Sequence, residues 1–168
     1  MKLKFIPIIT ILLISMTTFG QQLFGHVNSQ EILNAMPEAA TAQLALQEEL
    51  EGLQEQGQIM MQEFEAQQKD FQINQENMND AVRNDKLKSL ENLQERIMLF
   101  EQSAEQSIQM KQAELFEPIL TKIQNAIDEV AKENDYAYIF DLVGLQGGVV
   151  YRNDSYDITL LVRKKLNL

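Results

Sequence analysis

The sequence lacks cysteine and tryptophan, and its only histidine is His26. Without cysteine, a disulfide framework and a thiol nucleophile are excluded. With a single histidine as well, we do not expect the usual zinc sites or histidine-based triads within one chain. A lone histidine in a short strand is most often a packed or edge residue with no functional role. The sequence therefore predicts no enzyme, no catalytic residue, no metal site and no cofactor.

Basic residues are scarce, since 14 Lys and Arg stand against 25 Asp and Glu. Nucleic acid is not an expected partner, because proteins bind its phosphates largely through Lys and Arg. The acidic residues are also unevenly distributed along the chain. From Glu38 to Gln68 there are seven carboxylates and no base, whereas Lys69 to Arg96 holds five bases against six acids.

Long apolar runs are scarce too, and the clearest one lies at the N-terminus. It extends from Phe5 to Phe19 and follows Lys2 and Lys4. This pattern predicts a secretory signal peptide over residues 1–20. An uncleaved membrane anchor is the alternative, but the run is short for a spanning helix and contains a proline. Because no cysteine can be acylated, we expect no lipid tether and no stable membrane insertion after cleavage.

Proline and glycine are rare between Pro37 and Pro118, where good helix formers dominate. Apolar or tolerated residues recur there with alternating spacings of four and three, which is typical of a heptad seam. The first seam comprises Leu46, Leu50, Leu53, Gly57, Met60, Phe64, Gln67, Phe71, Asn74 and Met78. The second comprises Leu90, Leu93, Ile97, Phe100 and Ala104, and continues after a one-residue slip at Ile108, Leu115 and Ile119. The pattern predicts an antiparallel coiled-coil hairpin over residues 37–118.

The two seams are related by a mirror that pairs Phe64 with Ile97 and Leu53 with Ile108. Its centre lies near Asp80, in a segment rich in Asn and Asp, which favour turns and helix ends. We therefore expect the tip of the hairpin at residues 77–85 and arms of roughly 60 to 70 Å. Pro118 is expected to kink the returning helix close to its junction with the rest of the chain.

The remaining residues, 21–36 and 119–168, are expected to form a small β-rich body. Residues 23–27 are predicted to form a strand, and Asn28 a cap for the short helix that follows. Strands are also predicted at 136–140 and 149–151, arranged as a hairpin around Gly144, Gly147 and Gly148. That glycine-rich stretch lacks the helix and Lys of a phosphate loop. Asp157 is expected to cap a last helix.

A body of this size is marginal alone, so we expect oligomerisation through a shared β core. The fold class predicted is therefore α+β, with a small β-rich oligomerisation body and a long helical hairpin. Candidate oligomerisation residues are the large apolar residues of the predicted strands: Phe24, Val27, Ile139, Phe140, Val149 and Tyr151.

Several apolar residues of the hairpin are not required by its seams. They are Met61, Ile73, Val82, Leu87, Met98, Leu99 and Met110. One interpretation is ordinary surface content, which needs no explanation when it is scattered. The other is that single apolar points on long polar arms offer weak, adaptable contacts to unfolded chains. On the second interpretation these seven are candidate client-binding residues, and charge is not the general source of affinity, because the stems are acidic.

The order of the pieces resembles the Skp/OmpH family of periplasmic chaperones. The similarity rests on the predicted signal peptide, the stretches 24–33, 119–127 and 135–141, the intervening Gln- and Glu-rich hairpin, and Asp157 to Thr159. It implies a jellyfish-like homotrimer with a β body and helical tentacles. It also implies an ATP-independent holdase in the periplasm, which keeps unfolded outer-membrane proteins in a cavity between the tentacles. The best-known relatives are basic, whereas this chain is acidic.

A different class of function is also compatible with the sequence. A structural or adaptor protein of the envelope could dock one defined partner through the surface of a coiled-coil hairpin. Suppression of aggregation of several unrelated unfolded barrels would favour the holdase. A single stoichiometric partner in a crosslinking pull-down would favour the adaptor.

Overall fold

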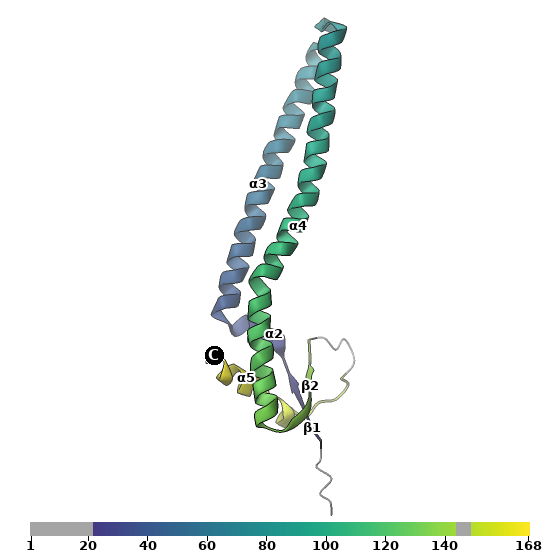
Figure 1. Ribbon diagram of the computed structural model, residues 1–168. Coiled ribbons are helices and arrows are strands. Elements are labelled where there is room, and N and C mark those ends of the chain that lie inside the picture. The colour runs from purple at the N-terminus through teal and green to yellow at the C-terminus, as the bar shows by residue number, and fades with distance from the viewer. Residues whose placement is uncertain (1–21, 144–148) are drawn as a thin grey trace, which may run out of the picture.

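The computed structural model describes residues 22–143 and 149–168, so the predicted signal peptide and the glycine-rich stretch 144–148 lie outside the described residues. Two long helices, joined by a short turn at their far end, run side by side away from a small body that holds the remaining elements (Figure 1). Along the chain these elements are β1 (Leu23–Val27), α2 (Ser29–Ala35), α3 (Pro37–Asn74), η1 (Gln75–Asn77), α4 (Asp80–Glu133), β2 (Tyr136–Asp141), η2 (Asp154–Tyr156) and α5 (Thr159–Lys165).

Local signals set the ends of the helices. The side chain of Asn28 accepts a hydrogen bond of 3.1 Å from the Glu31 amide, as predicted for the start of α2. Helix α3 begins at Pro37, where a missing backbone donor costs nothing. Asn79 caps α4 by accepting from the Val82 amide at 2.9 Å. Pro37 and the Asn79 cap explain why the two long helices begin where they do.

The tip of the hairpin is tight and lies slightly earlier than predicted. Helix α4 has already begun at Asp80, so the reversal falls on η1 and the two residues after it. The Arg83 guanidinium donates to the backbone carbonyls of Gln75 (3.1 Å) and Met78 (3.2 Å), which ties α4 to this turn. The centre of the hairpin is therefore near Met78 and Asn79, and the predicted centre near Asp80 and Ala81 is wrong by about two residues.

This displacement shifts the register of the distal hairpin by four residues. Lys86 contacts Asp70 at 3.1 Å, and Gly57 lies opposite Phe100, whose Cε1 would be 3.4 Å from an added Cβ. The same offset places Phe64 opposite Leu93, so the predicted pair of Phe64 with Ile97 is wrong.

Packing explains why the observed register is preferred. The predicted mirror would have set Gly57 against Ala104, the two smallest seam residues, and left a void between the helices. In the observed register each of them faces a large side chain, and Leu93 and Ile97 are buried. Nearer the body, the pair of Glu38 with Lys122 at 2.6 Å lies within one residue of the predicted mirror. The register therefore changes in the segment that contains the seam slip and Pro118.

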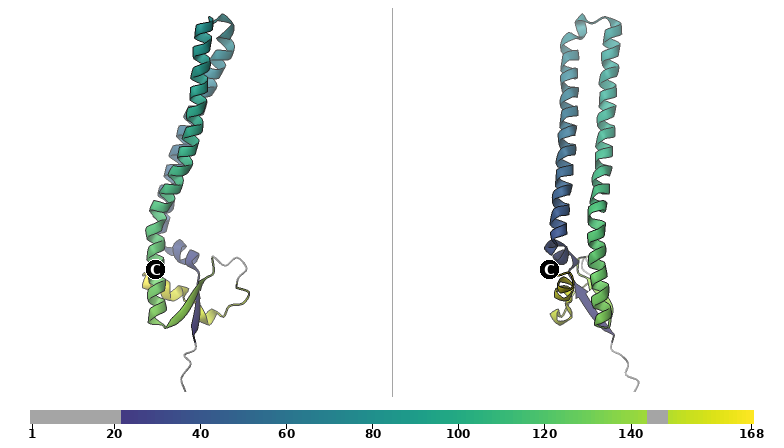
Figure 2. Two further views of the ribbon diagram at one scale, coloured as in Figure 1. Left: turned by 45° about the vertical axis from the view of Figure 1, so that its right-hand side comes forward. Right: turned by 60° about the vertical axis from the view of Figure 1, so that its left-hand side comes forward.

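Helix α4 continues unbroken through Pro118. It bends in its lower part, where the hairpin joins the body (Figure 1; a second view is given in Figure 2). A bend in this region agrees with the loss of one backbone donor and with the clash that a proline ring makes one turn back.

The sheet of the body differs from the prediction. Strand β2 pairs with β1 in parallel, with Phe24 opposite Tyr138 and Gly25 opposite Ile139. Residues 149–151 form no strand in the described chain, and Val150 is 97% exposed. The predicted hairpin of 136–140 with 149–151 is therefore wrong. Strand β1 supplies β2 with hydrogen-bonding partners, and Val27 of β1 and Ile139 of β2 pack in the same core. An exposed segment of three residues can match neither contribution.

The core of the body is built where the sheet, α2, the lower part of α4 and α5 meet. Its most buried side chains are Val27, Ile32, Met36, Ile158 and Val162. The Asp157 carboxylate accepts from the Thr159 amide at 2.8 Å, so it caps α5 as predicted. Gly25 has to be glycine for steric reasons, because an added Cβ would lie 2.9 Å from the ring of Tyr136.

Candidate functional site

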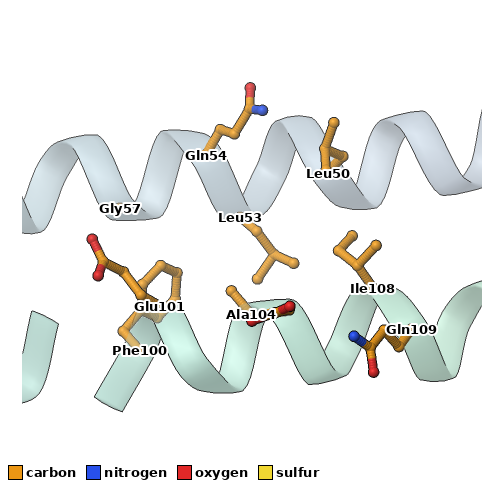
Figure 3. A pocket seen from close by; sticks show the side chains of 10 residues that line it. Leu50, Leu53, Gln54, Gly57, Phe100, Glu101, Ala104, Ile108 and Gln109 are labelled. Carbon is orange, nitrogen blue, oxygen red and sulfur yellow. The ribbon is translucent and has the colours of Figure 1, made fainter. Parts of the chain in front are cut away.

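A groove opens between α3 and α4 in the middle of the hairpin. It has a volume of about 540 Å³ and is open to solvent along one side. Figure 3 shows Leu53 and Ile108 pointing toward one another across it, with Ala104 and Phe100 on the α4 side. The residues that line the groove are Leu50, Leu53, Gln54, Gly57, Phe100, Glu101, Ala104, Glu105, Ile108 and Gln109.

Two small seam residues leave this part of the seam only partly filled, although each faces a large side chain. Gly57 has no side chain, and Ala104 carries a single methyl group where the neighbouring layers hold Leu93, Ile97 or Phe100. As a result Leu50, a seam residue, is 41% exposed. An exposed leucine at a seam position is an apolar side chain that the folded chain leaves partly in contact with water.

The rim of the groove is acidic. Glu101 and Glu105 line it four residues apart on α4, so that they are neighbours on the helix surface. In residues 22–143 and 149–168 neither carboxylate forms an ion pair, and the nearby Lys111 contacts Glu114 instead at 3.3 Å. No base lies on α3 before Lys69. The groove therefore combines an apolar floor with unneutralised negative charge.

All seven predicted client-binding residues are exposed, with fractions from 40% for Leu87 to 67% for Met110. The structure does not gather them into one patch. Their heptad positions place three of them on the side of the hairpin that carries the groove and four on the other. The groove side holds Met61, Leu87 and Met98, and the other side holds Ile73, Val82, Leu99 and Met110.

Other exposed apolar residues were not among those predicted. On α3 and α4 they include Leu44, Ile59 and Leu120, which are 63%, 58% and 51% exposed. The signal that could have found them is the same one, an apolar residue outside the seam. The groove itself was not predicted, because its shape depends on which residues of the two seams face each other.

The predicted oligomerisation residues divide between two environments. Val27 is 1% exposed and Ile139 packs against the core, so both lie inside the subunit, and Val27 is unsuited to a contact between subunits. Phe24, Phe140, Val149 and Tyr151 are exposed. Side chains alternate between the faces of a strand, which puts Phe24 and Phe140 on the outer face and Val27 and Ile139 on the inner one.

The outer face of the sheet carries three aromatic rings close together. Phe24 stacks on Tyr138 with ring centroids 5.7 Å apart, and its centroid lies 6.4 Å from that of Phe140. Tyr138, which the prediction missed, is 59% exposed. Strand alternation would have indicated it, because it lies two residues before Phe140. A stacked aromatic cluster at this exposure is an unpartnered apolar surface.

His26 is buried, lies opposite Phe140 in the sheet and is beside Asp157. Its Nε2 is 3.7 Å from the nearest carboxylate oxygen and has no hydrogen-bond partner in the described structure. Burial of the Asp157 carboxyl acts to raise its pKa, but hydrogen bonds from Thr159 and the charges of His26 and Arg152 outweigh burial, and the pKa is lowered. Since the Thr159 hydroxyl also accepts from the Asn28 amide at 3.0 Å, these groups join β1 to the start of α5.

Across the described ranges, no group of three or more His, Cys, Asp or Glu residues could hold a metal ion. Within the same ranges, no helix is both long and apolar enough to cross a membrane.

Comparison with known proteins relates this arrangement to one family. A search of curated proteins finds no significant match. A crystal structure from Caulobacter crescentus, described as a candidate outer membrane chaperone (OmpH-like), is similar with a TM-score of 0.72 and 10% sequence identity, over 88% of this chain and 85% of that one. That likeness concerns the fold. The family model for outer membrane protein (OmpH-like) matches residues 23–166, and the chain therefore belongs to the OmpH-like family.

Proposed function

We propose that this protein is an ATP-independent holdase chaperone of the periplasm that keeps unfolded outer-membrane proteins from aggregating. The observation that carries the proposal is that exposed apolar side chains are distributed over both sides of a long polar hairpin. Family membership supports it, as does the description of the structural relative as a candidate chaperone. An exported chain with a cleaved signal peptide would work in the same compartment as its clients.

Each contact with a client would be weak. A single half-exposed methionine or leucine buries little further area when a mobile chain touches it, and such contacts do not require the client to adopt one structure. Many of them on one arm, repeated on several arms, add up through multivalency. A client held in this way stays unfolded and can be released without nucleotide hydrolysis.

The active assembly in this proposal is a jellyfish-like homotrimer, with clients held in a cavity between the arms. The exposed aromatic cluster of Phe24, Tyr138 and Phe140 supports association through the body. Burying such rings between subunits would remove several hundred Å² of apolar surface from water. Val149 and Tyr151, which follow β2 in the chain and are exposed, are available for the same contact.

The test replaces the seven residues Met61, Ile73, Val82, Leu87, Met98, Leu99 and Met110 together by Gln or Ser. Helix content by circular dichroism and mass by sedimentation equilibrium should stay as in the wild type, whereas suppression of aggregation of unfolded barrels should be lost. A matched control changes exposed polar residues of the same helices, Gln58, Gln62, Gln72, Gln102 and Gln106, to Ser and should retain activity. Full protection by the seven-residue variant would refute this use of the arms.

The alternative, an envelope adaptor that docks one defined partner, predicts a different result. Crosslinking in the periplasm would then capture a single stoichiometric protein, and unrelated unfolded barrels would aggregate as fast with the protein as without it.

A further inference from the structure

We propose that the groove in the middle of the hairpin is a specificity site, which takes a large apolar side chain flanked by Lys or Arg in the unfolded client. This inference rests on the proposed function and names the class of segment that the arm prefers. The occupant is one stretch of polypeptide with an apolar residue at its centre and positive charge on either side of it.

The apolar part of the argument is the shape of the groove. Leu50, Leu53, Phe100 and Ile108 contribute its apolar lining, and about 540 Å³ is within the range of 300 to 1,000 Å³ typical of small ligand sites. Because it is open along one side, a chain can cross the hairpin and insert one side chain without threading. Exposed Leu50 gives the inserted group a surface to cover.

The charge of the rim identifies the flanking residues. Glu101 and Glu105 repel each other across one helical turn, and in the described chain no Lys or Arg neutralises them. A client cation placed between them relieves that repulsion. A client carboxylate at the same place adds to it, and the helix opposite offers no base before Lys69.

The same charge argues against a second copy of the hairpin as occupant. An arm of another subunit would bring its own acidic stem, from Glu38 to Gln68, against the acidic rim. A basic segment of an unfolded client meets no such repulsion.

Apolar burial and charge then have separable roles. Insertion of the apolar side chain supplies affinity that salt changes little, whereas the carboxylates supply preference that salt screens, since the Debye length is about 8 Å at physiological ionic strength. Binding of a neutral segment should therefore persist as salt rises, and the advantage of a basic segment over an acidic one should shrink.

Three peptides test the proposal on the full mature protein. They share a central Phe and differ in its neighbours, which are Lys, Gln or Glu, and their binding is followed by fluorescence anisotropy. We expect the Lys-flanked peptide to bind at least tenfold more tightly than the Glu-flanked one at low salt, with the Gln-flanked peptide between them. Equal binding of the Lys-flanked and Glu-flanked peptides would overturn the proposal.

Two variants locate the site. The double variant Glu101→Gln with Glu105→Gln should lower the preference for Lys over Glu neighbours several-fold while leaving the Gln-flanked peptide unaffected. Its control, Glu91→Gln with Glu95→Gln, removes the same charge at the same spacing on α4 but outside the groove lining, and should keep the preference. If the control lowers the preference as much, the acidic arm as a whole attracts bases and the groove assignment is wrong.

A third variant fills the groove. Ala104→Leu should weaken the binding of all three peptides by a similar factor, with helix content unchanged. Binding as tight as in the wild type would count against insertion of the apolar side chain into the groove. A changed mass of this variant in sedimentation would mean that another subunit covers the groove, which also overturns the proposal.

The holdase proposal is judged separately, by suppression of barrel aggregation in the wild type. If the wild type suppresses aggregation but binds the Lys-flanked and Glu-flanked peptides equally, only the groove inference fails.

Discussion

The body and the hairpin are stabilised in different ways. In the body, side chains from five elements converge on one core, and Ile32, Ile158 and Val162 are fully buried. Away from the body, the hairpin has only one narrow contact between two helices, with Leu93 and Ile97 as its buried residues. A single seam buries little area for each residue that it orders, so local opening of the arm costs far less free energy than opening of the body. In the proposed holdase, this difference would let the arms adapt to many chains while the body keeps the proposed assembly together.

The largest expected effect comes from breaking the body. Ile158→Ala removes a fully buried side chain and should lower the free energy of unfolding by about 2 to 5 kcal/mol. All four tyrosines lie in the body sequence, so tyrosine fluorescence reports on it separately from helix content, which reports mainly on the arms. We expect the fluorescence transition to move to lower denaturant concentration. Leu161→Ala, at a side chain that is 45% exposed, is the control and should have a much smaller effect. Equal shifts in the two variants would mean that the body has no dominant core.

A smaller effect of opposite sign is expected in the arm. Gly52 meets no atom within 4 Å of an added Cβ, so Gly52→Ala should stabilise α3 by about 0.5 to 1 kcal/mol through helix propensity. Thermal unfolding followed by circular dichroism would show a higher midpoint for the arm.

Gly57→Ala is the matched comparison for Gly52→Ala, because it offers the same gain in helix propensity. Its methyl group would also lie in ordinary contact with the Phe100 ring and narrow the groove. Of the two variants, only Gly57→Ala should weaken binding of the Lys-flanked peptide. A loss of stability in the Gly52 variant would contradict the open surroundings of that glycine.

Much of this fold could be predicted from sequence because its signals are local. Asn28 and Pro37 at helix starts, and the heptad seams themselves, depend only on residues a few positions apart. The register of the hairpin depends instead on which residues of the two helices face each other, and these are far apart in the sequence. A shift of four residues moves the partner of Phe64 from Ile97 to Leu93, which is also a seam residue, so Phe64 meets an apolar partner in either register. The choice is made by volume, with Gly57 facing Phe100 and not Ala104.

The sheet was harder to predict for a related reason. Residues 136–140 and 149–151 are close in sequence and both β-prone, which favours a hairpin, whereas the observed partner of β2 is β1, more than a hundred residues away. Only packing against α4 and α5 decides between them, because the inner faces of β1 and β2 supply core residues such as Val27. The groove was missed with the register, whereas Tyr138 could have been found from strand alternation, because it lies two residues before Phe140.

The smallest expected effect concerns pH and again separates body from arm. In the body, the pKa of Asp157 is lowered because hydrogen bonds from Thr159 and nearby positive charge outweigh the effect of burial. Its contribution to stability is therefore fully present above the unfolded pKa, near 3.9, and is lost as pH falls through the lower folded pKa. Tyrosine fluorescence should show the wild-type body losing more stability between about pH 5 and 3 than the variant Asp157→Asn, with the two converging at the acid end. In the arm, the pKa of Asp70 is also lowered, by its hydrogen bonds from Lys86 and Asn74, but the pair is exposed and solvent screens it. Asp70→Asn should therefore leave the acid profile of helix content almost unchanged, and a larger effect there than at Asp157 would reverse the comparison.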